Sequence, residues 1–480
     1  MKSKLIEALL NKDMLTENGM VTNSTSLNAL VDLFFVVGAM RKESKTDTGK
    51  DRLIAKFEAA FSQDPLIATK IMFWARNARG GAGEREVFKI VMNHLAKNKK
   101  SAALKNIKHI PTFGRFDDLF VFIGTPFEDE ALDVFVKALK DGNSLSAKWA
   151  PRLGGKVSKE KKFIANKIRN KMSLDAKEYR KLIVKLTNVV ETAMCQKNFS
   201  LIDFEKVPSL AMARYTKAFT KHDDGTFSSY IEALKSGDAK INSGAIYPYD
   251  VIKSLNASNS DLPIEQWRKL PNFLEGSTEN LITVVDTSGS MSIPVSGNTT
   301  AMEVALSLGL YISERTEGIF KDAFITFSRS PKLQYLYGDL RSRLAQLQRS
   351  NWGMNTDIEA VFYLILDKAV TNKVLVEEMP TSILILSDME FDRCSENADI
   401  SAIEMISGKY AKAGYKRPNI IFWNIASRLG QSPIRFDEQG TALVSGFSPA
   451  ILKEILTGDV NPIKIMMRTI ENPIYDVIEI

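Results

Sequence analysis

The sequence predicts two parts of different fold class: an N-terminal all-α solenoid over residues 1–275 and a C-terminal doubly wound α/β domain over residues 276–480. The chain of 480 residues is longer than one hydrophobic core ordinarily supports. Near residue 276, serial helical stretches give way to strands that alternate with helices. Residues 1–275 carry 45 Lys+Arg and 32 Asp+Glu, whereas residues 276–480 carry 19 and 25. The basic first part therefore predicts an anionic partner.

Helical periodicity supports the N-terminal prediction. Leu53, Phe57 and Phe61 lie four residues apart, and Pro65 begins the next element. The run Gly80–Gly83 interrupts the pattern before it restarts. Further helices are predicted at 130–139, 159–171 and 176–191, the last with Asp175 and Glu178 as a capping pair. Serial helices without a sustained strand pattern indicate a solenoid, although no clean sequence repeat is present.

The C-terminal part alternates short apolar runs with amphipathic stretches. Strands are predicted at 281–285, 323–327, 333–337, 383–386, 420–425 and 442–444, and helices at 301–312, 340–347, 358–364 and 448–456, with Ser448 as a cap. This alternation predicts a mostly parallel sheet covered on both faces.

The most informative motif is the sequence Asp286-Thr287-Ser288-Gly289-Ser290, which follows the apolar run 281–285. Mg²⁺ prefers oxygen ligands with only one or two carboxylates, and a tight turn at a strand end presents such oxygens. In open α/β sheets, ligands bind at the carboxyl ends of strands. The alternative is a strand-to-helix turn in which the hydroxyls only cap the helix.

Two further loops complete a candidate site. Thr356 lies in a Gly-containing loop before an apolar helix, and Asp388 follows the strand-like run 382–387. The three loops resemble the metal-ion-dependent adhesion site of von Willebrand factor type A domains. The resemblance implies that Mg²⁺, or another divalent cation, contacts Asp286, Ser288, Ser290 and Thr356, with Asp388 acting through a water molecule or as an acceptor behind the ligands.

The same resemblance implies an open coordination position for an acidic residue of a protein partner. The third loop departs from the family pattern, because Ser387-Asp388-Met389 stands where Thr-Asp-Gly is common. Glu390 and Asp392 add negative charge that competes for the open position.

Composition indicates a cytoplasmic protein. The 44% hydrophobic and 25% charged fractions are ordinary for a soluble globular chain, and no run of about 18 apolar residues predicts a membrane span. The first residues lack the pattern of a secretory signal. Cys195 and Cys394 lie far apart and form no disulfide framework.

Both parts together resemble the Ro autoantigen family, which joins a TROVE module to a type A domain. The resemblance rests on the segments 74–86, 114–119 and 387–392. It implies a ribonucleoprotein in which HEAT-like helical repeats form a ring. Single-stranded ends of small non-coding or misfolded RNA enter its basic hole, and structured RNA lies on the outer surface.

The residues themselves offer RNA-binding candidates. The densest basic stretch begins at Arg152 and contains Lys156, Lys159, Lys161, Lys162, Lys167, Arg169 and Lys171. Arg76, Arg79 and Arg85 flank the Gly80–Gly83 break, where backbone N–H groups can bind a phosphate. Arg115 and Phe116 can pair a guanidinium with a stacking ring. The alternatives are a solvated lysine face, arginines that bridge helices, and a core position for Phe116.

Catalytic patterns are weak. The chain has three histidines, His94, His109 and His222, without a nucleophile or metal-protease arrangement. The sequence therefore predicts a non-catalytic RNA-binding protein with a Mg²⁺-dependent docking domain. A metal-dependent protein assembly or scaffold module without RNA is the alternative. An RNA-processing nuclease is disfavoured, because carboxylates do not cluster outside the metal motif.

Overall fold

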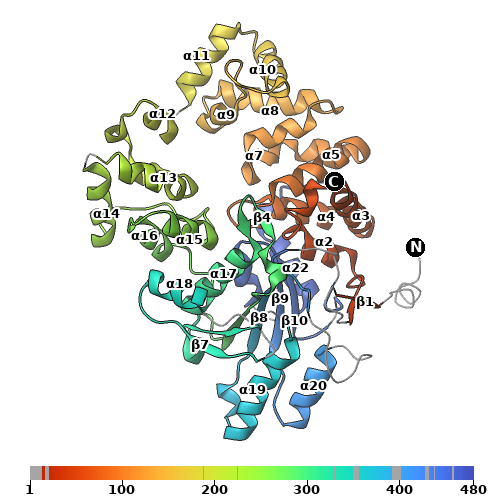
Figure 1. Cartoon of the computed structure of the whole chain (residues 1–480). Coiled ribbons are helices and arrows are strands. Elements are labelled where there is room, and N and C mark those ends of the chain that lie inside the picture. The colour runs from red at the N-terminus through yellow and green to blue at the C-terminus, as the bar shows by residue number, and fades with distance from the viewer. Residues whose placement is uncertain are drawn as a thin grey trace.

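The structure is a computed structural model that describes residues 13–16, 21–187, 189–223, 225–327, 330–349, 356–391, 402–426, 432–436, 438–456 and 459–480. Its first part is helical and its last part is built on a mostly parallel sheet (Figure 1). Asp392 and Cys394 lie outside the described residues.

The helices of the first part follow one another along an arc that starts and ends beside the sheet (Figure 1). In chain order they are α2 (Ala29–Val37), α3 (Asp47–Gln63), α4 (Pro65–Arg76), α5 (Arg85–Asn98), α6 (Lys100–Asn106), α7 (Ile110–Phe113), the 3-10 helix η3 (Phe116–Phe122), α8 (Glu128–Lys140), α9 (Ser144–Trp149), α10 (Lys159–Lys171), α11 (Ala176–Leu186), α12 (Val190–Cys195), α13 (Ser209–Lys221), α14 (Thr226–Ser236), α15 (Pro248–Ala257) and α16 (Leu262–Arg268).

Local sequence signals explain most helix boundaries. Asp64 accepts a bond from the Ile67 amide and Pro65 occupies the first position of α4. Asp175 and Glu178 form the expected capping box at the start of α11. The helix predicted over 176–191 is divided, because α11 ends at Leu186 and α12 begins at Val190. A short antiparallel hairpin, β1 (Asp13–Leu15) and β2 (Val21–Asn23), also precedes the helices and was not predicted.

The C-terminal sheet has the strand order β10-β9-β8-β3-β6-β7. The strands are β3 (Leu281–Val285), β6 (Ala323–Thr326), β7 (Leu333–Tyr335), β8 (Ser382–Ser387), β9 (Asn419–Asn424) and β10 (Thr441–Ser445), all parallel to their neighbours except β7. Every residue of β3, β8 and β10 is buried, as expected for strands covered on both faces.

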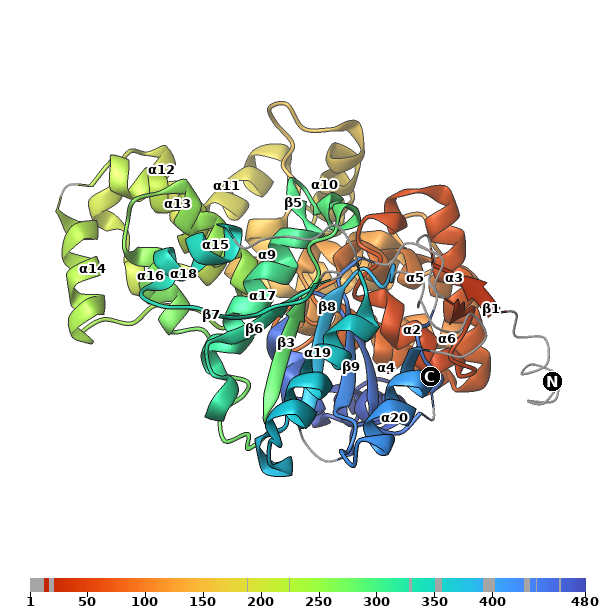
Figure 2. The same ribbon diagram turned by 60° about the horizontal axis from the view of Figure 1, so that its bottom comes forward.

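Helices of both parts of the chain cover this sheet (Figure 2). The C-terminal helices are α17 (Ala301–Arg315), α18 (Leu340–Arg349), α19 (Ile358–Asn372), α20 (Ala402–Lys412), α21 (Leu452–Ile455) and α22 (Pro462–Ile470), and a hairpin of β4 (Pro294–Ser296) and β5 (Thr299–Thr300) precedes α17. Helix α17 packs on β3, and Gly309 permits the close approach, because a Cβ there would lie 2.6 Å from a Val285 methyl group.

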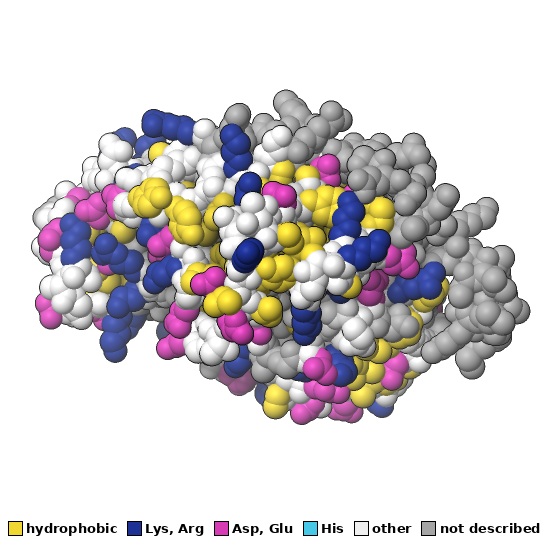
Figure 3. Space-filling model, turned by 90° about the horizontal axis from the view of Figure 1, so that it is seen from below, with side chains coloured by type: hydrophobic (Ala, Val, Ile, Leu, Met, Phe, Trp, Pro, Cys, Tyr) yellow, Lys and Arg dark blue, Asp and Glu magenta, His cyan; other side chains and the backbone are white. Residues whose placement is uncertain are grey.

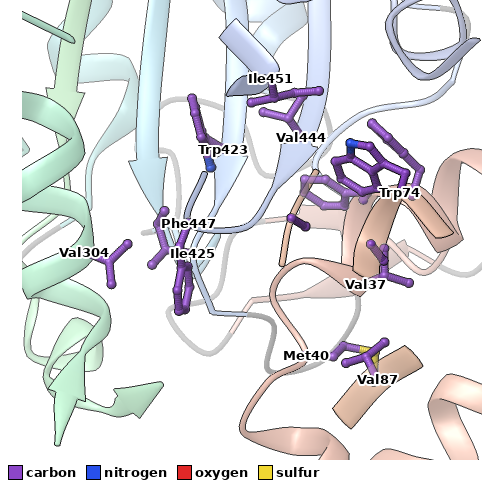
Figure 4. Packing of buried hydrophobic residues seen from close by; sticks show 14 of the residues in the cluster. Val37, Met40, Trp74, Val87, Val304, Trp423, Ile425, Val444, Phe447 and Ile451 are labelled. Atoms are coloured by element: carbon purple, nitrogen blue, oxygen red, sulfur yellow. The ribbon is translucent and has the colours of Figure 1, made fainter. Parts of the chain in front are cut away.

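The two ends of the helical arc are both fixed to the C-terminal domain. At one end α2 packs on β10 and α4 on α22, and at the other end α15 packs on α17. Figure 4 shows Trp74 of the first part on the side of Val444 of the sheet domain, and Met40 beside Val87. One continuous apolar core therefore spans both parts, and a second, smaller core lies among α13, α14 and α16. None of the described helices is long and apolar enough to cross a membrane.

Candidate metal centre and nucleic-acid interface

The first candidate site, the carboxylate edge, consists of the five predicted metal ligands Asp286, Ser288, Ser290, Thr356 and Asp388. Strands β3 and β8 are neighbours in parallel register, so the residues that follow them meet at one sheet edge. The Ser387 hydroxyl donates to Asp286 Oδ2 at 2.5 Å, which joins the first loop to the third. On the first loop, the Ser288 amide donates to Asp286 Oδ1 at 2.9 Å, and the Ser288 and Ser290 hydroxyls are 2.8 Å apart.

The second loop joins the same edge through Thr356. Its hydroxyl donates to the Glu390 carbonyl at 2.8 Å, and the Glu390 amide donates to Asp388 Oδ1 at 3.3 Å. Asp286, Thr356 and Asp388 are each at most 2% exposed. The structure thus brings the three predicted loops together at one buried point. The supporting hydroxyl of Ser387 was missed, and only its place at the end of a strand beside Asp388 signals it.

Met389 explains how the third loop turns without glycine. Its φ is +67°, in the left-handed region that L side chains adopt at a cost, and the position is the one where the resembling family commonly has glycine. The side chain is 2% exposed, so apolar packing helps to offset that cost. The Met389 amide donates to the Ser387 hydroxyl at 3.0 Å and fixes the turn.

The electrostatics of the carboxylate edge suit a cation. Burial, together with the negative charge of Asp388, raises the pKa of Asp286 to about 7. Within the described ranges, no Lys, Arg or His forms an ion pair with Asp286. A hard divalent cation is coordinated by carboxylate and hydroxyl oxygens and would neutralise this charge. The residues present therefore fit such an ion. Over the same described ranges, no three His, Cys, Asp or Glu side chains form a metal-binding group, so any ion here depends on hydroxyl ligands.

The second candidate site, the cationic cleft, is an open hollow of about 1040 Å³ among α3, α5, η3, α9 and α10. Eight cationic and three acidic side chains line it. The cationic ones are Lys50, Arg85, Lys89, Lys97, Arg115, Lys148, Arg152 and Lys161, and the acidic ones are Asp51, Asp117 and Glu160. Lys97 and Lys161 form no ion pair with any side chain in the described parts of the chain. Five of the eight cations pair with carboxylates, namely Lys50, Arg85, Lys89, Arg115 and Lys148. The cations that remain along the wall suit a polyanion.

Arg115 stacks on an aromatic ring, but not on the one predicted. Its guanidinium carbon lies 3.2 Å from the centroid of the Trp149 ring. Phe116 instead packs edge-to-face against Phe135 at 6.1 Å and lies half-buried against the helical core. Phe116 is not among the residues that line the cleft with Arg115, and its contact with Phe135 favours the core alternative for this ring. Trp149 was missed because it lies 34 residues along the chain from Arg115.

Two of the predicted arginines belong to an ion-pair network. Arg76 is 3% exposed and its Nη2 lies 2.7 Å from Asp118 Oδ2. Arg85 bonds Asp118 at 2.6 Å and Asp117 at 2.7 Å, and retains some exposure on the cleft. A Cβ on Gly114 would lie 2.5 Å from Asp118 Oδ2, so only glycine fits beside the network. Arg76 thus bridges elements in the interior and is not available to a phosphate.

The glycine-rich break after α4 is not a phosphate nest. The Arg79 and Gly80 amides donate to Asn77 Oδ1 at 3.0 and 3.3 Å, and the Gly81 amide donates to the Asn77 carbonyl at 3.2 Å. The prediction that these amides bind a phosphate is therefore wrong, because Asn77 already holds them. The Arg79 side chain itself is exposed.

The predicted lysine stretch divides into two groups. Lys167 pairs with Glu128, and Lys171 pairs with Asp129 and Asp133 at 3.1 Å, so these cations hold α10 against α8. Arg169 donates to the Leu174 carbonyl at 3.2 Å. Lys161 lines the cleft, whereas Lys156 and Lys159 are exposed and Lys162 is half-buried. The opposite side of the molecule, seen from below in Figure 3, carries interspersed cationic, acidic and apolar side chains rather than one sign of charge.

Comparisons with known proteins match both parts of the chain. Residues 16–132 and 156–291 match the family model described as Domain of unknown function (DUF2828), and residues 280–471 match the one described as Domain of unknown function (DUF7788). The chain is similar to "Uncharacterized protein L728" of Acanthamoeba polyphaga mimivirus, with 28% identity over 517 aligned residues that cover 96% of this chain and 88% of the relative. It is also similar to the crystal structure of the Deinococcus radiodurans RO (RSR) protein, with a TM-score of 0.48 and 14% identity over 88% of this chain and 93% of that one.

Proposed function

The chain belongs to the family described as Domain of unknown function (DUF2828), and we propose that within this family it is a non-catalytic, cytoplasmic RNA-binding protein. Its helical part grips single-stranded or misfolded small RNA, and its C-terminal domain docks a partner through Mg²⁺ or another divalent cation. The observation that carries the proposal is the cationic cleft, where Lys97, Arg152 and Lys161 add positive charge to a wall whose other cations are paired with carboxylates.

The chemistry of the cleft favours RNA over a small anion. Lys97 and Lys161 lie on different helices and offer point charges along a groove, which suits successive phosphates of a strand. Trp149 and Phe120 add aromatic surface to the same walls, and base stacking on such rings supplies affinity without sequence preference. The resemblance of segments 74–86 and 114–119 to the Ro autoantigen family points to the same ligand class.

The carboxylate edge supports the docking half of the proposal. Asp286, Ser288 and Ser290 present oxygens from one turn, and Thr356 and Asp388 complete the set from two neighbouring loops. A divalent ion bound there would retain positive charge and could take an acidic side chain from a protein partner. The ion would also relieve the repulsion between Asp286 and Asp388.

The histidines support a role without catalysis. His94 Nε2 lies 2.6 Å from Glu58, and its Nδ1 lies 3.2 Å from the Asn98 amide, so both ring nitrogens have partners. His222 stacks on Phe199 with the ring centroids 4.9 Å apart. His222 therefore takes part in packing, whereas His94 lies on the wall of the cationic cleft with both ring nitrogens held by Glu58 and Asn98.

The test is RNA capture by the whole chain. The protein is purified from its own cells, and the ratio of absorbance at 260 and 280 nm is measured before and after nuclease. Fluorescence anisotropy with labelled single-stranded RNA then gives affinity as a function of salt. We expect nuclease-sensitive absorbance and an affinity that falls steeply with salt. Protein without bound or bindable RNA, together with a Mg²⁺-dependent protein complex that survives nuclease, would favour the alternative of an assembly module.

A further inference from the structure

The cationic cleft contains a rigid aromatic-cation pair that the phosphate-binding role does not require. The Arg115 guanidinium lies over the Trp149 ring, with its carbon 3.2 Å from the ring centroid. Asp117 fixes the guanidinium from the side, since its two oxygens accept from Nε at 2.9 Å and Nη2 at 2.7 Å. Both Arg115 and Trp149 line the cleft, and the Arg115 side chain keeps 34% of its exposure.

We propose that Arg115 and Trp149 form a stacking platform for one unpaired nucleobase, while Lys97, Arg152 and Lys161 bind the phosphates beside it. The proposal rests on the RNA-binding function above and assigns it a site and a specificity. A flat, delocalised cation backed by an indole presents the kind of surface on which bases stack. Bases inside a duplex are stacked on one another, so the platform selects an unpaired segment.

The platform is held in place before any ligand binds. Helix α9 ends at Trp149, and the Pro151 carbonyl just beyond it accepts a bond at 2.9 Å from the buried Tyr179 hydroxyl. On the opposite side, Asp117 also accepts from Arg85, and Arg85 is tied to the buried Asp118. Little side-chain freedom is therefore lost on binding, which favours affinity.

The competing explanation is that Arg115 and Trp149 only stabilise the fold. Arg76 is an example of an arginine with that role. The Arg76 guanidinium pairs with the same acidic segment but is 3% exposed, so it serves only the interior. Arg115 differs because it faces a hollow lined mainly by cations, and its acidic partner Asp117 leaves a net positive environment.

The experiment separates base recognition from phosphate recognition. Three proteins are compared, the unchanged chain, Trp149→Leu and Trp149→Phe, with two probes of equal length and charge: a labelled oligouridine and the same RNA with abasic sites. The unchanged chain should bind the probe with bases about tenfold or more tightly. Trp149→Leu should lose this preference, whereas Trp149→Phe should retain most of it.

The salt dependence gives a second readout that a folding defect would not mimic. Because Trp149→Leu removes no phosphate contact, the slope of log affinity against log salt should stay as in the unchanged chain. Circular dichroism confirms that each variant is folded. If the unchanged chain binds neither probe, the RNA-binding function itself is wrong. If it binds both probes equally, or if a folded Trp149→Leu keeps the preference for bases, the platform is wrong and the function stands.

Discussion

The cationic cleft and the carboxylate edge handle charge in opposite ways. The cleft is assembled from five helical elements and leaves Lys97 and Lys161 on the wall of an open hollow. The carboxylate edge is assembled from the loops that follow β3 and β8 and from the residues before α19, and it buries Asp286 completely. Lysine ammonium groups remain solvated at little cost, whereas a buried carboxylate is stable only with hydrogen bonds or a counter-ion. The contrast suits the two ligands that we propose, a polyanion at the cationic cleft and a divalent cation at the carboxylate edge.

The largest expected change in the free energy of unfolding follows from removal of Asp118, the buried ion-pair partner of Arg76. Asp118→Ala should destabilise the fold by about 3–5 kcal/mol, because it leaves Arg76 buried without its partner. Urea unfolding followed by circular dichroism measures the change. Lys97→Ala, at a cation of the open cleft, should stay within about 0.5 kcal/mol of the unchanged protein. If Asp118→Ala and Lys97→Ala lowered the free energy of unfolding equally, the proposed difference between buried and solvated charges would be wrong.

The next effect tests whether the carboxylate edge binds a cation. Asp286→Ala should weaken Mg²⁺ binding by at least about 100-fold, since removing even an outer partner of a metal ligand costs 10–100-fold. In the unchanged protein, Mg²⁺ at 100 times its Kd should add about 2.7 kcal/mol of stability, which thermal unfolding detects and the variant should lose.

A neighbouring carboxylate provides the control for this prediction. Asp357 accepts from the Ala360 amide at 3.0 Å and caps α19 one residue after Thr356. Asp357→Asn removes that charge and keeps a capping side chain. Its Mg²⁺-dependent stabilisation should persist. A stabilisation by Mg²⁺ that survives Asp286→Ala would place the ion elsewhere.

A smaller effect is expected at the cleft lysines. Lys97→Ala combined with Lys161→Ala should weaken binding of single-stranded RNA and reduce the slope of log affinity against log salt by about 1.4, or 0.7 for each lost phosphate contact. Fluorescence anisotropy at several salt concentrations gives both values. Lys159→Ala combined with Lys162→Ala removes the same charge from α10 outside the cleft lining and should leave the slope nearly unchanged. A larger loss in that second variant would move the RNA from the cleft to the outer face of α10.

The smallest effect is expected on RNA affinity when the divalent cation is removed, because the two sites should bind their ligands independently. Removal of divalent ions by a chelator should change RNA affinity by less than about twofold, because affinity in the cleft comes from lysine and arginine contacts. The same anisotropy titration, repeated with and without chelator, measures it. A loss of RNA affinity on chelation would show that the carboxylate edge and the cleft act as one site.

The sequence predicted the carboxylate edge better than the cleft. Asp286, Ser288 and Ser290 lie within five residues and Asp388 follows a second apolar run, so the ends of two neighbouring strands place these four together. Thr356 instead precedes the apolar helix α19, and the sequence marks it only by that position. The cleft draws Lys50, Lys97 and Trp149 from elements far apart in the chain. No local pattern indicates that such residues share a wall, because that depends on how helices pack.

Three arginines of the first part also show that sequence position does not predict which side chains are exposed. Arg76, Arg79 and Arg85 have similar sequence surroundings, yet the first is buried against Asp118, the second is exposed, and the third is divided between ion pair and cleft. Asn77 likewise holds amides that the glycine run had suggested were open to a phosphate. Burial and competing hydrogen-bond partners determine which of these groups can reach a ligand. The spacing of residues in the sequence predicts neither.

The sequence by itself determined the helical and alternating patterns, most element boundaries, the unequal distribution of charge, and the order of the oxygen-bearing residues along the strand ends. These depend on periodicity, capping and strand polarity, which act over a few residues. Tertiary structure alone decided that α2 packs on β10, that both ends of the helical arc rest on the sheet domain, and that Arg115 stacks on Trp149. Those contacts join residues separated by tens to hundreds of positions, and only packing of the whole chain brings them within van der Waals distance.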